Sequence, residues 1–468
     1  MNRAQLLLTA AAAVTLSACQ SYPVRMPDPA VLPAAYPAAD VTGGAAAADL
    51  DWSSVIRDPR LLKLIDLALT DSRDLRLAML DVEAARAQLR AQNASFYPQV
   101  QAGAQHSGSR QPMMIPGATP MAASMDLTTV SLSLTAFELD LFGRLRAQSQ
   151  SAFATYLAAE DGARAARITL VSAVAEAYLA ERAADERRSL ARLTAQDWDA
   201  SLALTQRLRQ AGQSDGVALA QAEGQARTAQ AEWEAAERAH RQALNALSLV
   251  VGAPLPTDLP APLALTEGPV RLDIAPGLPS ELLARRPDIL QAQQRLKAAQ
   301  ADVRAAKAAF FPTISLTGQY GFTSGDLDNL FDRASRTWAY TPQIGLPILQ
   351  GGRLRAQHSL ADVRSNVAVA NYEKTVQTAF REVSDGLAAR ATYGGQIAAQ
   401  VGVVDAAQRR AVLSERLFRA GVSDRIERLD AQRSLYAARQ TLIQLRQEQA
   451  TASITLFRAL GGPAPDPS

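Results

Sequence analysis

Two acidic residues near the C-terminus have a spacing that could do electrostatic work. Glu427 and Asp430 are three residues apart, so on a helix their carboxylates share one face. Carboxylates placed together can attract cations or pair with basic side chains. The same spacing is also typical of a solvated helix face, so the pair alone decides nothing about function.

The other residue types that often carry chemistry are not arranged for catalysis. The three histidines, His106, His240 and His358, lie in different segments and lack metal-ligand spacing. The sequence has no phosphate-binding glycine loop followed by lysine and no nucleophile elbow. We therefore expect no enzyme activity, no metal and no cofactor, and an energy source in a partner protein.

The single cysteine, Cys19, lies at the end of a signal-like N-terminus. Residues 1–18 combine a basic start, a short apolar run and small residues before the cysteine, which predicts a cleaved signal peptide. The apolar run is too short to span a bilayer as a helix. A single cysteine also excludes disulfides and thiolate metal sites.

This N-terminus resembles a bacterial lipobox. The resemblance implies that Cys19 is the lipidated first residue of the mature protein; a plain signal peptide with an incidental cysteine is the alternative. Gln20 and Ser21 follow the cysteine instead of an aspartate, which in the sorting pattern of lipoproteins implies the outer membrane. Residues 19–50, rich in proline, alanine and glycine, are expected to form an extended tether.

Composition and charge exclude some classes of partner. The chain has 468 residues, 48% of them hydrophobic, and a formal net charge of +2. It is long enough to bury a large core. Its small net charge gives no strong case for binding nucleic acid or an acidic substrate.

One junction occurs twice and organises the chain. A run with helical periodicity ends in two aromatic residues and a proline at Pro98, and again at Pro312, 214 residues later (312 − 98). Upstream of both prolines, apolar residues step by seven at the same offset: Leu75, Val82 and Leu89, then Ile289, Leu296 and Val303. Downstream, apolar and small polar residues alternate by two, as in a strand with two different faces. The sequence therefore predicts a helix followed by a strand in each of two copies.

Each copy is predicted to contain the same order of elements. In the first we expect a helix, a strand, a loop, a strand, a long helical region, a turn and a return helix, over residues 58–93, 98–106, 107–124, 127–139, 143–210, 211–216 and 217–250. In the second the helix, the two strands, the long helical region, the turn and the return helix cover residues 280–309, 312–322, 338–349, 353–419, 420–424 and 425–460. We expect one break in the first long helical region and a loosening of the second near Gly394 and Gly395.

The predicted domain boundaries follow this plan. They are a signal peptide, a tether, a first repeat, an equatorial linker, a second repeat and a tail, over residues 1–18, 19–50, 51–250, 251–279, 280–460 and 461–468. Seven prolines forbid a regular helix in the linker.

The predicted strands cannot complete a membrane structure within one chain. Four strands are too few to close a barrel, and an open sheet in lipid would leave unpaired edges, so we expect the chain to oligomerise. The strands alternate like outer-membrane strands, and their Ser, Thr and Gln face suits a water-filled lumen. A soluble sandwich edge is the alternative, but helical runs of about 65 residues, on the order of 100 Å long, leave such a sheet nothing to pack on.

The order of these motifs resembles the outer membrane factors, the TolC-type and NodT-type lipoprotein channels. The matching motifs are the duplicated aromatic-proline strands, the Gly-Arg-Leu-Arg starts at Gly143 and Gly352, the Ala-Gly turns, and Arg-Arg-Pro-Asp-Ile at 285–289. Together they cover nearly all of the mature chain. The resemblance implies a mixed α and β fold built from an internal duplication: a trimeric outer-membrane β-barrel, four strands per chain, continued by a long periplasmic α-helical barrel.

The resemblance also implies partners. These are two further copies of the chain in a homotrimer, outer membrane lipid, a periplasmic adaptor (membrane fusion) protein that docks on the hairpin tips, and an inner-membrane pump, usually of the resistance-nodulation-division class. The expected docking residues lie in the two turns: Ala211, Gly212, Ser214, Ala420, Gly421 and Ser423. Glycine in these turns has a purely structural explanation as well, since it allows a left-handed backbone, and both explanations can hold.

By the same resemblance, Glu427 and Asp430 match acidic positions that line the constricted periplasmic end of such channels. A ring of carboxylates from three chains would favour cations and could hold the pore shut with basic partners. Three residues depart from the TolC-type pattern, Phe418 in place of a tyrosine, Ser423 in place of a basic residue and Ala218 in place of an acid. Arg425 and Arg428 could take over the basic role.

The leading functional hypothesis is a passive exit duct for small molecules in a tripartite efflux system. The duct of a type I protein secretion system is the alternative within the same architecture. A lipid-anchored periplasmic scaffold without a pore is an alternative of another class, and an envelope hydrolase is a distant third because no site supports it.

Overall fold

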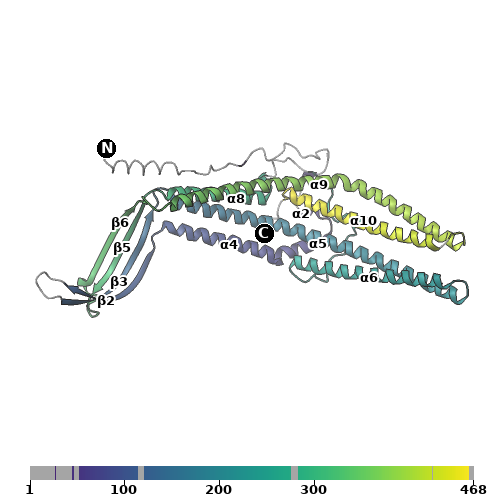
Figure 1. Cartoon of the computed structure of the whole chain (residues 1–468), viewed down its shortest axis with the longest axis horizontal. Helices are drawn as coiled ribbons and strands as arrows, with labels where there is room; N and C mark the ends of the chain where they lie inside the picture. Colours follow the sequence, from purple (N-terminus) through teal and green to yellow (C-terminus); the bar gives the residue numbers. More distant parts are fainter. Residues whose placement is uncertain are drawn as a thin grey trace, which may run out of the picture. The chain divides into compact units, whose positions relative to one another are not determined.

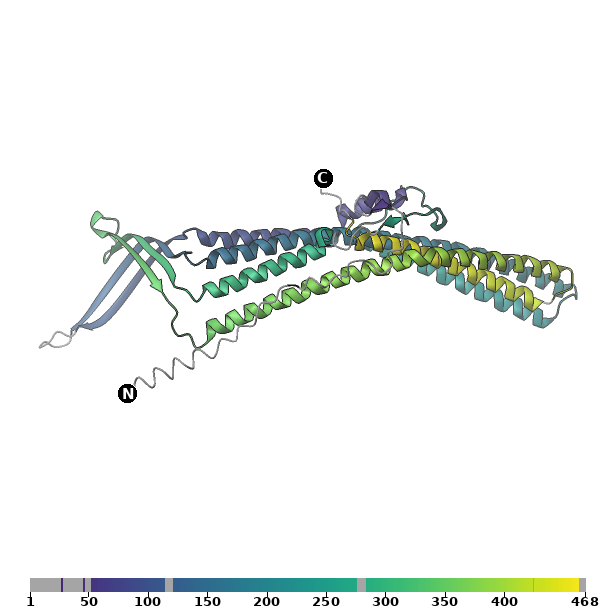
Figure 2. The same ribbon diagram turned by 90° about the horizontal axis from the view of Figure 1, so that it is seen from above.

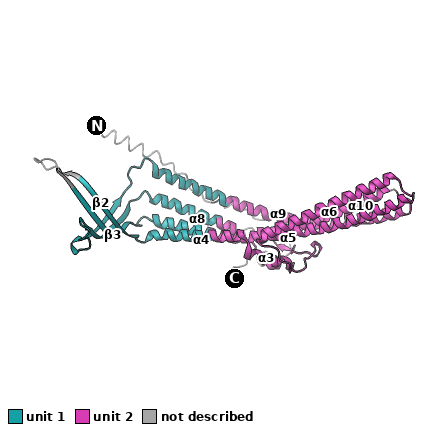
Figure 3. Ribbon diagram, turned by 90° about the horizontal axis from the view of Figure 1, so that it is seen from below, with its two compact units in different colours: residues 1–27, 82–158, 292–372 teal, residues 28–81, 159–291, 373–468 magenta. Residues whose placement is uncertain are grey.

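The computed structural model describes residues 27, 45–46, 52–113, 121–275, 283–423 and 425–462. The predicted signal peptide, Cys19, nearly all of the predicted tether and Asp424 of the second turn lie outside the described residues, as do 463–468 of the predicted tail. The chain divides into two compact units, and each takes segments from both copies of the duplication (Figure 3). Unit 1 contains residues 1–27, 82–158 and 292–372, and unit 2 contains 28–81, 159–291 and 373–468.

Unit 1 contains one four-stranded antiparallel sheet with the order β2-β3-β5-β6 (Figure 1). Its strands are β2 (Val100–Met113), β3 (Met121–Leu139), β5 (Thr313–Ser324) and β6 (Arg336–Gly345). The outer sides of β2 and β6 have no partner strand among the described residues. The four strands expected from the alternating sequence are therefore confirmed, and the sheet is open at both edges.

The strand boundaries differ from the prediction in two places. The expected loop 107–124 is wrong, because β2 continues to Met113 and β3 starts at Met121, paired throughout; backbone pairing needs no apolar alternation, so the irregular sequence hid it. The strand expected to reach residue 349 ends at Gly345. Pro347 lacks the N–H that a ladder needs, which explains the earlier end.

A bulge interrupts β3 and changes which residues share a face. The pairing with β5 shifts between Leu134 and Phe137, and Ala136 has a positive φ of 40°. The expected row of alternating residues through Ala136 is therefore broken there, because an extra residue on one strand reverses the alternation.

The long helices are continuous. The α-helices are α2 (Trp52–Val55), α3 (Pro59–Asp71), α4 (Arg73–Asn93), α5 (Arg144–Gln210), α6 (Gly216–Val251), α8 (Pro287–Ala308), α9 (Arg353–Arg419) and α10 (Arg425–Ala459). Helices α5 and α9 each run for 67 residues without interruption. The expected break in the first and the expected loosening near Gly394 and Gly395 in the second are therefore wrong. A helical glycine costs only about 1 kcal/mol, which a long packed helix tolerates.

One shorter helix is split and another begins later than predicted, each for a local reason. The helix expected over 58–93 is split at Ser72, which has an extended backbone and accepts a hydrogen bond from the Leu75 N–H at 3.4 Å, as a helix N-cap does. The helix expected from 280 begins as α8 at Pro287, after a short helical turn at 283–285. Proline favours the first position of a helix and disfavours helix in the residue before it.

The linker between the copies has no α-helix over residues 252–275, as predicted. It contains a 3₁₀ turn at Leu265–Glu267 and the two-residue strand β4 (Ile274–Ala275), which pairs in parallel with β1 (Ala45–Ala46). Further 3₁₀ turns lie at Ala94–Phe96 and Arg333–Ser335. Among the described residues, no helix combines the length and the apolar character needed to cross a bilayer.

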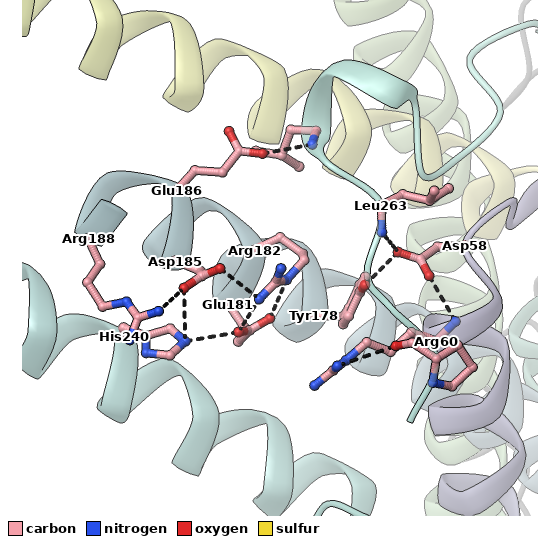
Figure 4. A network of polar contacts seen from close by, with 12 residues as sticks. Asp58, Arg60, Tyr178, Glu181, Arg182, Asp185, Glu186, Arg188, His240 and Leu263 are labelled. Atoms are coloured by element: carbon pink, nitrogen blue, oxygen red, sulfur yellow. Dashed lines mark hydrogen bonds and ion pairs between the residues drawn. The ribbon is translucent and has the colours of Figure 1, made fainter. Parts of the chain in front are cut away.

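A buried carboxylate in unit 2 ties the linker to two helices (Figure 4). Asp58 is fully buried and caps α3 as expected, accepting from the Arg60 N–H at 2.8 Å. It also accepts from the Tyr178 hydroxyl at 2.5 Å and from the Leu263 N–H at 3.0 Å. Burial and the Asp58 carboxylate raise the pKa of Tyr178 far above its ordinary value, so the tyrosine stays a neutral donor to a charged acceptor.

A second buried cluster lies one turn further along α5 (Figure 4). Glu181 accepts two hydrogen bonds from Arg182, both at 2.7 Å, and its other neighbour is the His240 ring at 3.1 Å. Asp185 joins Arg182 and Arg188. The cluster links α5 to α6 with its charges paired, which is the condition under which buried ions are tolerated.

Candidate functional site

The turns of the two long helical hairpins have the same backbone structure. In unit 2 the α5–α6 and α9–α10 hairpins lie side by side with their turns at the same end (Figure 2). Gly212 and Gly421 have φ values of 70° and 71°. In both turns the glycine N–H bonds the carbonyl three residues back and the next N–H bonds the carbonyl five residues back. This is the Schellman arrangement that ends a helix with glycine.

The predicted docking residues lie on these turns with different exposure. Ala211, Gly212, Ala420 and Gly421 are exposed, whereas Ser214 and Ser423 are half-buried. A Cβ added at either glycine would meet nothing within 4 Å. The glycines are therefore required by the backbone turn and not by close packing. Large apolar side chains are exposed beside them: Val217, Val422 and Ile426.

The two acidic residues are brought together by one arginine. Arg410 on α9 donates to both carboxylate oxygens of Glu427, at 3.0 and 3.1 Å, and to Asp430 at 2.7 Å. Ser414 donates to Glu427 at 3.3 Å. Hydrogen bonds to Glu427 and Asp430 raise the pKa of Arg410. Glu427 and Asp430 therefore share one face of α10, as their spacing predicted, and that face meets α9.

The two expected basic partners face the other hairpin. Arg425 donates to Thr205 at 2.9 Å, and Arg428 donates to Ser201 at 2.7 Å. Burial and the nearby charge of Arg428 lower the pKa of Arg425. In the structure these arginines thus bond hydroxyls of α5, and the Glu427 and Asp430 carboxylates bond Arg410.

Phe418 and the two arginines form a pocket between the hairpins. The Arg428 guanidinium lies 4.7 Å from the centroid of the Phe418 ring, a cation–π contact, and 3.6 Å from Glu415. The pocket has a volume of about 340 Å³. It is lined by Ser201, Leu204, Thr205, Leu208, Gln213, Ser214, Asp215, Ala218, Phe418, Arg425 and Arg428.

Sequence reasoning missed three residues of this site: Arg410, Ser201 and Thr205. One of them had a usable signal. Residues at similar distances on either side of an antiparallel turn face each other, and Arg410 precedes Gly421 by 11 positions while Asp430 follows it by nine. The hydroxyls had no such signal, because they belong to the other hairpin.

The site has no metal-binding arrangement in the described part of the chain, where His, Cys, Asp and Glu do not gather in groups of three that could hold an ion. Its chemistry is that of charge pairing at the end of a helical hairpin. Such contacts can hold neighbouring helices together or release them, and they can attract or repel ions.

Comparison with known proteins identifies the architecture. The family model described as "Outer membrane efflux protein" matches residues 64–253 and 278–462. Outer membrane protein OprJ of Pseudomonas aeruginosa is 42% identical over 452 residues, which cover 96% of this chain and 94% of OprJ. The probable efflux pump outer membrane protein TtgC of Pseudomonas putida is 40% identical over 420 residues, 89% of this chain and 86% of TtgC.

A solved structure agrees. The open state of the MtrE outer membrane channel of Neisseria gonorrhoeae superposes with a TM-score of 0.83 at 34% identity, covering 94% of this chain and 97% of MtrE. The expected fold class, the outer membrane localisation and the function as the outer membrane component of an efflux system are confirmed. The chain belongs to the outer membrane efflux protein family.

Proposed function

We propose that three copies of the chain form one channel. The observation that carries this proposal is the open sheet, in which the outer sides of the edge strands β2 and β6 have no partner strand in the described chain. An open edge in lipid leaves backbone N–H and C=O groups without partners. Pairing β6 of one copy with β2 of the next removes both edges, and three copies of four strands make a barrel of twelve.

The channel is the passive exit duct of a tripartite efflux system. It carries small molecules that an inner-membrane pump, of the resistance-nodulation-division class, delivers through a periplasmic adaptor. Relatives named as efflux pump outer membrane proteins support efflux over protein secretion or a scaffold without a pore. The chain itself catalyses no reaction, and Cys19 carries the lipid that anchors it to the outer membrane.

The adaptor docks on the two hairpin turns. Ala211, Gly212 and Ser214 form the first docking turn, and Ala420, Gly421 and Ser423 form the second. Exposed apolar side chains beside them support an interaction surface, since Val217, Val422 and Ile426 are 67%, 75% and 65% exposed.

Glu427 and Asp430 form the acidic gate. Three copies would place three such pairs at the end of the helical hairpins, where they attract cations. Arg410 offsets part of this negative charge within each copy. Arg425 and Arg428 act in the gate through their hydrogen bonds from α10 to α5. These bonds couple the movements of the two hairpins.

Single-channel conductance in planar bilayers tests the duct and the gate together. We expect a small, cation-preferring conductance from the wild type, and a wider or less selective one from Glu427→Ala/Asp430→Ala. Asp405→Ala is a suitable control, because Asp405 is an exposed acid on α9 away from the Arg410 contacts. Folded trimers that conduct no current would contradict the duct and favour the scaffold. Equal selectivity in the wild type and the double variant would contradict only the gate.

A further inference from the structure

The sheet of unit 1 has one apolar face, and that face ends in two arginines. Residues paired across antiparallel strands share a face. One face carries Leu132, Tyr320, Trp338 and Tyr340, all of them large and exposed. The opposite face carries hydroxyls and amides that bond one another, including Gln319 to Ser131 and Thr129 to Thr323. The apolar face suits lipid, and the polar face suits water.

Arg110 on β2 and Arg336 on β6 lie on the apolar face at its distal end. On β2, Arg110 lies ten residues beyond Val100 in the direction away from the helices, and an even spacing puts both side chains on one face. On β6, Arg336 and Trp338 are two residues apart and share that face. Both guanidiniums are exposed. The same face also carries an acidic residue, Asp126 on β3. Asp126 pairs with Gly108 of β2, and its carboxylate lies over that glycine.

One aromatic ring, that of Tyr320, packs against Arg336 on the apolar face. The Arg336 guanidinium lies 5.8 Å from the centroid of the Tyr320 ring, and the rings of Trp338 and Tyr340 are stacked with centroids 5.9 Å apart. Arginine above a row of Trp and Tyr is typical of a membrane interface, where the rings meet lipid and the charge meets headgroups.

The duplication predicts which residues meet between copies. Within one chain, Leu139 at the proximal end of β3 pairs with Ile314 of β5. The two copies are offset by 209 residues after the second strand (352 − 143) and by 214 at the first (312 − 98). The residue that corresponds to Leu139 in the second copy, 209 positions later, is Ile348, and the residue that corresponds to Ile314 in the first copy, 214 positions earlier, is Val100. By analogy with the contact within one chain, Ile348 of one subunit therefore lies opposite Val100 of the next. Extended along β6 and β2, this register puts Trp338 opposite Arg110.

Arg336 of one copy then lies diagonal to Arg110 of the next, within reach of a shared ligand. A slip of two residues, the smallest that keeps the apolar faces together, would place the two arginines directly opposite each other. A slip of two residues in the other direction would place Tyr340 opposite Arg110, four residues from Arg336, so a shared ligand requires one of the first two registers. Two guanidiniums side by side repel unless an anion lies between them.

We propose that each junction between subunits binds the phosphorylated headgroup of an outer-leaflet glycolipid, held by Arg110 of one copy and Arg336 of the next. This inference rests on the proposed trimer. Guanidinium groups bind phosphate oxygens through paired, charge-assisted hydrogen bonds. Tyr320, Trp338 and Tyr340 pack against the acyl chains below the headgroup. Asp126 weakens the site, because its charge opposes the bound phosphate.

Native mass spectrometry of the detergent-solubilised full-length trimer, titrated with bis-phosphorylated lipid A or with dephosphorylated lipid A, tests the site. We expect the phosphorylated lipid to bind at one copy per junction. We expect Arg110→Gln and Arg336→Gln each to weaken that binding roughly tenfold or more. Asp126→Asn should strengthen it, and Arg409→Gln, which removes an exposed arginine from α9, should leave it unchanged.

The outcomes separate the site from the trimer. If the two lipids bind equally, or if Arg110→Gln/Arg336→Gln binds the phosphorylated lipid as well as the wild type does, the headgroup site is wrong. Competition by inorganic phosphate at similar concentration would show recognition of a free ion and not of a lipid, and would also overturn it. A mass corresponding to single chains under all conditions would contradict the proposed trimer instead.

Discussion

The turns at the ends of the α5–α6 and α9–α10 hairpins share a backbone and differ in side chains. Gly212 and Gly421 are 209 positions apart and have nearly the same φ. At the same offset, Arg410 corresponds to Ser201 and Glu427 corresponds to Ala218. The first turn therefore lacks both halves of the charge pair that the second turn has.

The difference shows that turn geometry and charge are set separately. A glycine in the left-handed conformation is enough to end each helix, whatever surrounds it. The charged cluster of Arg410, Glu427 and Asp430 belongs to the second copy only, whereas Arg425 and Arg428 of that copy use hydroxyls of the first copy as acceptors. Three chains would therefore carry three acidic pairs and not six, because only the second hairpin of each chain has one.

Replacing Arg428 by the residue of the first copy should have the largest effect on stability. Arg428→Leu copies Leu219, and it removes the hydrogen bond to Ser201 and the stacking on Phe418. Arg428 is 6% exposed, so we expect the free energy of unfolding to fall by about 2 kcal/mol. Denaturant unfolding of the purified protein measures the loss. Arg409→Leu, at an exposed position, is the control. A loss of the same size there would show that the buried contacts of Arg428 are not the cause of the destabilisation.

The two glycines should respond alike. Gly212→Ala and Gly421→Ala each force a side chain into the left-handed region, which costs about 1–2 kcal/mol. Neither added Cβ would meet a neighbour, so no steric difference separates them. Gly402→Ala in α9 has an ordinary helical backbone and open space, and should stabilise the protein slightly. A much larger loss at Gly421 than at Gly212, in thermal unfolding, would show that one glycine does more than turn the chain.

Most of the fold could be predicted because its signals are local. The prolines at 98 and 312 end helical runs, alternating residues form strands, and Gly212 and Gly421 end helices. Asp58 was predicted as a helix cap because its position before Pro59 is sufficient. The errors have local causes as well, since neither the bulge at Ala136 nor the paired strand ends leave an alternating pattern.

The candidate site was predicted less completely because its contacts cross between elements. The spacing of Glu427 and Asp430 placed them on one face, but no spacing within α10 indicates that Arg410 would hold both. Arg425 and Arg428 were expected to pair with acids; the structure gives both of them hydroxyls on α5, and it places Arg428 near an acid as well, Glu415 on α9. Two helices from different copies have to be packed together before those neighbours are known.

Removing matching hydroxyls should affect the two turns unequally. Thr205 and Ser414 are 209 positions apart, but Thr205 accepts from Arg425 whereas Ser414 donates to Glu427. Thr205→Val should cost about 1 kcal/mol, because the half-buried Arg425 loses its acceptor. Ser414→Ala should cost less, since Glu427 keeps its two bonds to Arg410. The melting temperatures of the two variants measure the difference. A larger decrease for Ser414→Ala would show that the Ser414 hydroxyl contributes more to stability than the Thr205 hydroxyl.

Replacing Arg410 by the serine of the first copy should barely change stability but should change ion selectivity. The Arg410 contacts are exposed, so solvent screens them and they contribute little to folding. Without Arg410 the carboxylates of Glu427 and Asp430 lose their neutralising charge. We expect Arg410→Ser to raise the preference for cations in single-channel recordings. The increase should be larger at about 0.1 M salt than at about 1 M, where charges are screened within a few ångströms.

A double-mutant cycle separates this effect from a general change at the turn. If Arg410 acts through the carboxylates, Arg410→Ser should have no effect on selectivity in the Glu427→Ala/Asp430→Ala background. Arg409→Ser, one position earlier on α9, should leave selectivity unchanged in either background. An increase that persists without the acids would mean that Arg410 repels cations directly. In that case the charge difference between the two turns would lie in the arginine alone, and the acidic pair would be its structural support.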